Sequence, residues 1–292
     1  MIISIPTLKD RHILTPRVEI SGDATPESNL DGSPAEIGRR ARRSRQLAFS
    51  RAVGLLLTLA LAQPLSVAAQ GVDFSQPPVH VVRWWEGAVA IGALSGLMLL
   101  DHPVQRFAQD HRGSGGNDVA RTLRHVGQPE IYGTVTLGLL GAGLISGHDE
   151  VTRAGGRLAA TLALAGATTT VGKWAFGRPR PSESLDADGY DPFSGQDAMP
   201  SGHSTMAFAM ATALADDIRN PWASVGLYTL ATGVGWSRVN DNRHWLSDVA
   251  AGALVGITSA KLMDGRWRLF NLHPPSILIG PHQAEIAWHM TF

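Results

Sequence analysis

The sequence predicts an all-α fold, a bundle of six helices followed by a small β-hairpin. The first observation is a set of six apolar segments that lack the strict alternation of a strand and are long enough for helices. The second is that alternation does appear near the C-terminus, on both sides of a Gly280-Pro281 pair, as in a hairpin. The six segments cover residues 84–100, 131–147, 158–171, 204–215, 222–236 and 249–263.

Two further stretches precede the bundle. Residues 1–46 are polar, contain proline and show no periodicity, which indicates a disordered extension or a misassigned start codon. Residues 47–69 hold an apolar run at 52–62 and end in small residues, and arginines precede them. This layout is typical of a secretory signal cleaved after Ala69, and the alternative is an uncleaved membrane anchor. The predicted helical domain then covers 70–273, and the hairpin covers 274–292.

Composition limits the class of protein. The formal net charge is zero, which gives no indication of a nucleic-acid partner. There are no cysteines, so disulfides, thiol catalysis and cysteine metal sites are excluded. The sequence also lacks a His-Glu-x-x-His stretch and a dense carboxylate cluster. We therefore expect neither a metal nor another cofactor.

Three short motifs lie at the ends of predicted helices. They are Lys173–Pro181 after the third segment, Pro200–His203 before the fourth, and Ser237–Asp248 between the fifth and the sixth. This placement predicts that all three motifs meet at one end of the bundle.

The motifs carry the groups that phosphoryl transfer requires. A transferred phosphoryl group spreads negative charge over three oxygens, so a catalyst needs several donors aimed at them. Arginine matches phosphate with a planar fork, and glycine lets backbone N–H groups approach an anion closely. The cations that can supply this charge are Lys173, Arg178, Arg180 and Arg238, and the neutral donors are Ser201 and the N–H groups around Gly202.

The two histidines of the motifs can take different roles. His244 and Asp248 are four residues apart in a stretch that we interpret as the start of a helix, which puts both side chains on one face. Asp248 can then accept the Nδ1–H of His244 and leave Nε2 free to act as a nucleophile. His203 lies in the turn before an apolar helix, where it can act as general acid and base.

The pattern Lys-x6-Arg-Pro, Pro-Ser-Gly-His and Ser-Arg-x5-His-x3-Asp resembles the signature of the type 2 phosphatidic acid phosphatase and vanadium haloperoxidase superfamily, with no position missing. The resemblance implies a six-helix bundle of the acid phosphatase/vanadium haloperoxidase type over roughly 84–265. It also implies that His244 forms a phosphohistidine, that His203 is the general acid/base and that Asp248 orients His244. The phosphate ligands that it implies are Lys173, Arg180, Ser201, Gly202 and Arg238. Arg178 is not a signature position.

These observations predict a metal-independent phosphatase that hydrolyses a phosphate monoester or diphosphate, with a lipid as the organic part of the substrate. One alternative is a soluble periplasmic acid phosphatase that acts on small phosphomonoesters. The other is a vanadate-dependent haloperoxidase, because vanadate mimics the pentacoordinate transition state. Vanadate would inhibit a phosphatase, and it would be the cofactor of a haloperoxidase.

The apolar helices, with tryptophans at their ends, favour a membrane surface or bilayer as a partner. We expect an exported, membrane-associated protein of a bacterial cell envelope, with its site facing the periplasm. The segments run a little short of the ~20 residues that a bilayer requires. Six crossings after a cleaved signal would also turn the site to the cytoplasm, against the outward orientation that the resemblance implies. The number of membrane spans therefore stays open.

Overall fold

The computed structural model describes residues 80–269, 276–280 and 283–287. The predicted extension at 1–46 and the predicted signal or anchor at 47–69 lie outside these residues, so both stay predictions. The described residues are mostly helical, which confirms the all-α class. Their helices are α2 (Trp84–Met98), α3 (Asp101–Asp110), α4 (Ser114–Val126), α5 (Pro129–Ser146), α6 (Asp149–Phe176), α7 (Gly202–Ile218), α8 (Pro221–Asn240) and α9 (Leu246–Met263).

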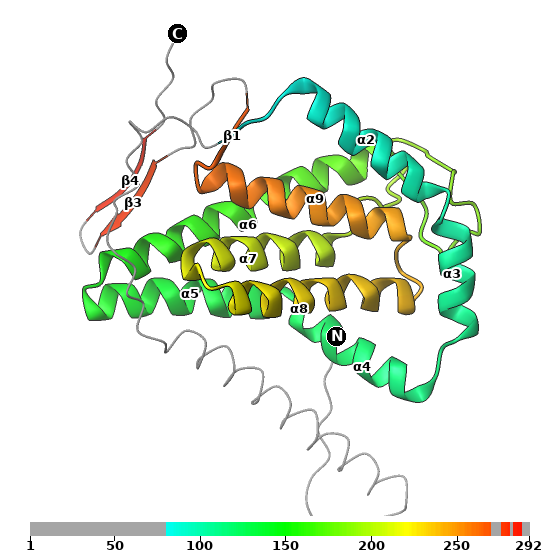
Figure 1. Cartoon of the computed structure of the whole chain (residues 1–292), viewed down its shortest axis with the longest axis horizontal. Helices are drawn as coiled ribbons and strands as arrows, with labels where there is room; N and C mark the ends of the chain where they lie inside the picture. The colour runs from blue at the N-terminus through cyan, green and yellow to red at the C-terminus, as the bar shows by residue number, and fades with distance from the viewer. Residues whose placement is uncertain (1–79, 270–275, 281–282, 288–292) are drawn as a thin grey trace, which may run out of the picture. The chain divides into compact units, whose positions relative to one another are not determined.

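Helices α5 to α9 run side by side and form the bundle (Figure 1). Helix α7 lies between α6, α8 and α9 and packs against all three. The contact with α9 is close because α9 presents glycines to α7. A Cβ on Gly252 would lie 2.6 Å from the carbonyl oxygen of Ser201, and one on Gly256 would lie 2.4 Å from that of Thr205. Any larger residue at these two positions would push the helices apart.

Helices α3 and α4 are the main difference from the predicted bundle of six. Both helices are short and largely polar. The prediction relied on apolar runs, and such runs are absent from a surface helix that buries only one face. Helix α3 packs against α8 and α9, and α4 packs against α8. Helix α6 is also longer than the predicted segment 158–171. The prediction missed its first turns because they carry charged residues such as Asp149 and Glu150.

The strands form two separate pairs. Strand β1 (His80–Val81) pairs in parallel with β2 (Trp267–Arg268), which follows α9. Strands β3 (Ser276–Gly280) and β4 (Gln283–Ala287) form an antiparallel hairpin, as the sequence predicted, and β3 lies against α6. Residues 281–282 and 288–292, which include His282 and His289, lie outside the described residues.

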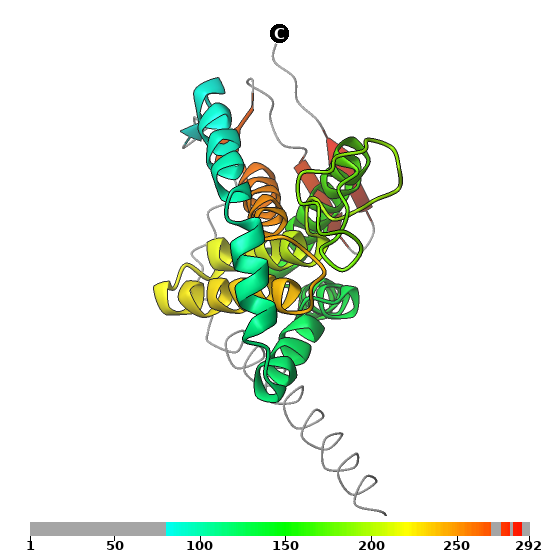
Figure 2. The same ribbon diagram turned by 90° about the vertical axis from the view of Figure 1, so that its right-hand side faces the viewer.

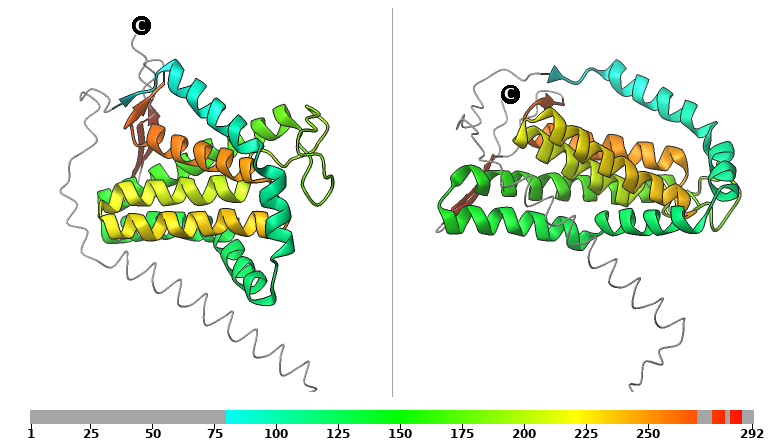
Figure 3. Two further views of the ribbon diagram at one scale, coloured as in Figure 1. Left: turned by 45° about the vertical axis from the view of Figure 1, so that its right-hand side comes forward. Right: turned by 60° about the horizontal axis from the view of Figure 1, so that its bottom comes forward.

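The three motifs meet at one end of the bundle, as predicted. Helix α6 ends there, α7 begins, α8 ends and α9 begins, and the N–H of Ser201 donates to the carbonyl of Asp248 at 3.0 Å. Figure 1 shows the α6–α7 loop and the α8–α9 connection at this end, beside α3. Figure 2 faces this end of the bundle, and the two views in Figure 3 show the same arrangement.

Within the described ranges, few helices have the properties of a membrane span. Helix α9 has the length and the hydropathy to cross a bilayer, and α2 with α3 passes as a pair that is bent by 47°. A core helix of a soluble protein passes the same test. Helix α2 is nevertheless unusual, because none of its 15 residues is buried although most are apolar. It exposes Trp84, Val89 and Ile91 by 83%, 63% and 67%.

Candidate active site

The end of α6 directs the first motif. Gly177 ends the helix in the left-handed conformation with φ 50°. A Cβ at this position would lie 1.7 Å from the carbonyl oxygen of Asp191, so only glycine fits. The N–H of Asp191 in turn donates to the carbonyl of Gly177 at 3.0 Å. These contacts fix the direction of the chain after α6, where Arg178 and Arg180 lie in different environments.

Arg178 is completely buried, and it does not contribute to an exposed ring of cations. Its Nε donates to the carbonyl of Ala187 at 2.8 Å. Its Nη1 donates to Ser247 Oγ and to Asp248 Oδ1, and its Nη2 to Asp101 Oδ2, each at 2.7 Å. The grouping of Arg178 with the phosphate-binding cations was therefore wrong. Its single positive charge is shared by two buried carboxylates, whose burial without a partner would be strongly unfavourable.

Asp101 is a member of this network that the sequence reasoning missed. It is the first residue of α3 and is completely buried. Besides Arg178, it accepts the N–H of Ser247 at 2.8 Å and the hydroxyl of Ser247 at 2.6 Å. It thus joins the start of α3 to the start of α9. The available signal was an acidic residue directly after the apolar run 84–100, where a carboxylate is unfavourable without a partner.

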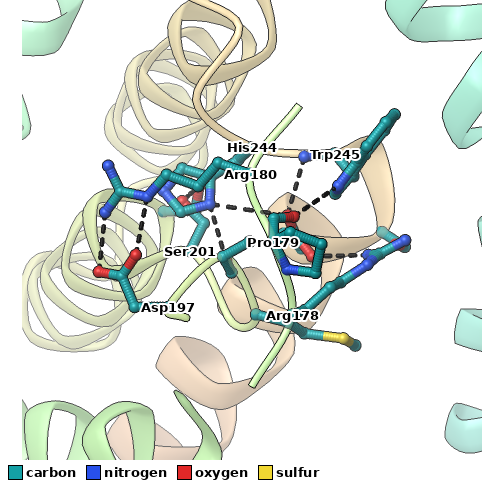
Figure 4. A network of polar contacts seen from close by, with 12 residues as sticks. Arg178, Pro179, Arg180, Asp197, Ser201, His244 and Trp245 are labelled. Carbon is teal, nitrogen blue, oxygen red and sulfur yellow. Dashed lines mark hydrogen bonds and ion pairs between the residues drawn. The ribbon is translucent and has the colours of Figure 1, made fainter. Parts of the chain in front are cut away.

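Lys173 and Arg180 converge on Asp197. Arg180 donates from Nε to Oδ1 at 2.8 Å and from Nη2 to Oδ2 at 2.7 Å (Figure 4). The Nζ of Lys173 donates to the main-chain carbonyl of Asp197 and lies 3.7 Å from Oδ2. Burial lowers the pKa of Lys173, although Asp197 acts in the opposite direction. Burial acts to raise the pKa of Asp197, but Arg180 and Lys173 together hold it below its ordinary value.

Arg238, at the end of α8, retains an unused donor. The residue is 6% exposed, and its Nε is buried with no hydrogen-bond partner in the described part of the chain. Its Nη1 lies 3.3 Å from Asp241 Oδ2, and Nη1 of Arg124, from α4, lies 3.3 Å from the same oxygen. Burial lowers the pKa of Arg238 to about 10; Asp241 opposes this and Arg124 adds to it. A buried guanidinium with a free N–H is suited to an anionic ligand.

The second motif supplies a helix N-terminus. Helix α7 begins at Gly202, so its first N–H groups have no partner within the helix and form a region of positive potential. The N–H of Ser201 donates to the carbonyl of Asp248, and its buried hydroxyl accepts from Ser204 Oγ at 3.0 Å. This contact does not use the hydroxyl proton of Ser201, and the role of Ser201 as a phosphate donor stays a prediction.

His244 lies just before α9, which begins at Leu246, and so it is not on the helix as predicted. Its Nδ1 lies 2.7 Å from the carbonyl of Ala198 and 3.7 Å from Asp248 Oδ2 (Figure 4). Because a carbonyl only accepts, Nδ1 carries the proton and Nε2 is the free nitrogen. Asp248 instead accepts the N–H of Trp245 at 2.8 Å and acts on His244 as a nearby charge. Burial lowers the pKa of His244, and Asp248 opposes this effect.

His203, the second residue of α7, is partly buried, and no hydrogen bond from the described residues holds its ring. Burial lowers its pKa to about 4, and the charge of Arg238 acts in the same direction. Lys173 contributes more weakly. The imidazole is therefore neutral at neutral pH. Its neighbours include Arg238 of the third motif and also Arg124 and Gly127, at the C-terminal end of α4.

The family to which this arrangement belongs follows from a sequence comparison. The family model of the PAP2 superfamily matches residues 154–267, which include all three motifs. These residues form a PAP2-superfamily domain. The resemblance that the motifs carried is thereby confirmed.

Individual relatives match parts of this chain. The lipid A 1-phosphatase of Porphyromonas gingivalis is 44% identical over 108 residues, which cover 36% of this chain and 22% of that protein. The chain thus spans about a fifth of the length of this relative. The crystal structure of Aquifex aeolicus LpxE matches 56% of this chain and 94% of its own, with 22% identity and a TM-score of 0.45. A transmembrane PAP2 type phosphatidylglycerolphosphate phosphatase from Bacillus subtilis matches 62% and 95%, with 19% identity and a TM-score of 0.47.

In the ranges that the structure describes, no group of three or more His, Asp or Glu side chains is arranged to hold a metal ion. The expectation that the PAP2 domain needs no cofactor stays a prediction. The expectation that vanadate is an inhibitor or, in the haloperoxidase alternative, a cofactor also stays a prediction.

Proposed function

We propose that the PAP2 domain hydrolyses the phosphate monoester or diphosphate of a lipid through a phosphohistidine intermediate. The observation that carries the proposal is the state of His244. Its Nδ1–H is held by the carbonyl of Ala198, which leaves Nε2 unprotonated among the cations of the three motifs.

In the first step, Nε2 of His244 attacks phosphorus, and a P–N bond forms as the P–O bond to the leaving group breaks. Lys173, Arg180 and Arg238, with the first N–H groups of α7, balance the charge on the three remaining oxygens. The carboxylate of Asp248 stabilises the positive charge that develops on the ring. In the second step, water attacks phosphorus and the P–N bond breaks.

His203 moves the protons of both steps. It donates a proton to the leaving oxygen and later takes one from the attacking water. Burial is the largest cause of the lowered pKa of His203, and two of the cations that add to it, Arg238 and Lys173, are among those that a bound phosphate dianion would offset. Phosphate binding therefore raises the pKa of His203 toward the range in which it can act as an acid.

Exposed apolar side chains beside the site support a lipid as the substrate. Trp174 follows Lys173 in the chain and is 60% exposed, and Phe193 in the α6–α7 loop is 83% exposed. Helix α2 adds a further apolar surface. The lipid A 1-phosphatase relative acts on a lipid phosphate by its name. An exported, membrane-associated location with the site facing the periplasm is part of the same proposal.

Replacing His244 with alanine tests the proposal. The purified full chain is assayed against phosphatidate, phosphatidylglycerophosphate, undecaprenyl diphosphate and a soluble phosphomonoester, and acid-labile phosphoenzyme is trapped with labelled substrate. We expect His244→Ala to lose turnover and phosphoenzyme. His111→Ala, which changes an exposed histidine of the α3–α4 connection, should leave both unchanged.

Labelled phosphoenzyme in the His244→Ala variant would show that another residue is the nucleophile. Equal turnover of the soluble ester and the lipids would contradict the lipid part of the proposal and favour the acid phosphatase alternative. Inhibition by orthovanadate is expected, together with little effect of chelators. Oxidation of bromide with peroxide and vanadate would instead identify a haloperoxidase.

A further inference from the structure

The carboxylate of Asp197 occupies the two guanidinium donors of Arg180 that are best suited to phosphate. Its two carboxylate oxygens accept from Nε and Nη2 of Arg180 in a bidentate pair, at 2.8 and 2.7 Å. A phosphate group presents the same two-oxygen edge to a guanidinium. These two donors cannot serve the carboxylate and a phosphate at once. Asp197 therefore imitates the ligand that Arg180 is expected to bind.

The main chain next to this carboxylate is tied down independently of it. The carbonyl of Asp197 accepts from Lys173. The N–H of Ala198 donates to the carbonyl of Arg178 at 2.9 Å, and its carbonyl holds Nδ1 of His244 at 2.7 Å. Because these bonds involve only main-chain atoms of 197 and 198, the side chain of Asp197 can rotate away while they persist. Lys173 then keeps its bond to the main-chain carbonyl and loses only the 3.7 Å ion pair with Oδ2.

The side chain of Asp197 can also move into solvent. It is 43% exposed, whereas those of Arg180 and Lys173 are 24% and 21% exposed. The carboxylate therefore regains hydration when it leaves, and the cations stay in place to receive an anion. An ion pair of this exposure is weak enough to be exchanged for another.

We propose that the carboxylate of Asp197 is an internal competitor for phosphate, which must leave Arg180 before the substrate phosphate binds there. This inference rests on the proposed function, because it takes Arg180 to be a phosphate ligand. The consequence is a lower affinity for anions at this site. Competition reduces the affinity of a terminal phosphate and that of a monoanionic phosphodiester headgroup by a common factor and leaves their ratio unchanged.

The test removes the carboxylate and measures anion binding directly. Affinities of inorganic phosphate and of dimethyl phosphate, a soluble phosphodiester, are measured by calorimetry on the full chain and on Asp197→Asn. We expect both to bind about three- to tenfold more tightly in the variant, by a common factor, as expected for the loss of one partly exposed ion pair. The matched control is Asp188→Asn, which removes an exposed carboxylate from the same loop and should change neither affinity.

Unchanged or weaker phosphate binding in Asp197→Asn would overturn the proposal and make Asp197 a residue that positions Arg180. A clearly larger gain for phosphate than for dimethyl phosphate would also overturn it, because the carboxylate would then stay beside the bound anion and repel the dianion more. Asp197→Ser provides a second variant if the amide disturbs folding. Repeating the measurement in His244→Ala keeps the result independent of whether the protein is a hydrolase.

Discussion

Replacing Arg178 with methionine is expected to destabilise the protein strongly. The guanidinium is completely buried and is the partner of two completely buried carboxylates, Asp101 and Asp248, at 2.7 Å each. Methionine keeps an apolar stem of similar length but leaves both carboxylates without their cation. Removing one member of a buried ionic network reduces the free energy of unfolding by about 3–5 kcal/mol. This is a large share of the roughly 5–15 kcal/mol that stabilises a typical domain.

The assay is denaturant unfolding of the purified chain, followed by circular dichroism. Arg121→Met is the matched control, because Arg121 pairs with Asp118 at 2.8 Å while the two side chains are 43% and 60% exposed. An exposed pair of this kind contributes about 1 kcal/mol or less. The two variants thus differ in burial while the substitution is the same. Similar small losses in both would refute the reasoning that Arg178 neutralises buried carboxylates.

Three further predictions concern the site and the packing around it. Asp248→Asn should leave the affinity for inorganic phosphate nearly unchanged. It should slow phosphoenzyme formation at least about tenfold, because the charge beside His244 is lost. An unchanged rate in single-turnover kinetics would remove Asp248 from the mechanism. The pKa of His203 should lie near 4 without ligand and rise when phosphate binds. NMR measures this pKa, and the His203→Asn variant assigns the signal; a pKa near 6.5 without ligand would contradict the effect of burial and of the neighbouring cations. Because the folded-state pKa of His203 is lowered, its contribution to stability should be lost as the pH falls from about 6.5 toward 4. Gly256→Ala should destabilise the fold by about 1–3 kcal/mol in denaturant unfolding, because its Cβ would lie 2.4 Å from a main-chain oxygen of α7. Gly226→Ala, with no atom within 4 Å, should be neutral or stabilising, so equal effects of the two would speak against close α7–α9 packing.

The bundle was largely predictable because its helices are apolar along most of their length. The hairpin was predictable for the corresponding reason, since strict alternation is a local property. Helices α3 and α4 were not found, because their composition is polar; they pack against α8, and α3 also against α9. The position of α3 depends on Asp101, whose buried partners come from distant elements that the local sequence does not specify.

The candidate site shows the same division. The residue types of the three motifs, and their positions at helix ends, were enough to predict one shared end of the bundle. The orientation of His244 was predicted with the right tautomer but the wrong partner. The carbonyl of Ala198 holds Nδ1, and a main-chain carbonyl leaves no signature in the residue type.

The sequence alone thus determined the helical class, the PAP2 signature and the set of groups available to an oxyanion. The tertiary structure decided which of these groups face the site. Arg178 and Arg180 are chemically identical and two residues apart, yet one is buried between carboxylates from α3 and α9 and the other is partly exposed beside Asp197. The physical reason is that the free energy of a charge depends on burial and on partners from distant elements, which neither residue type nor spacing specifies.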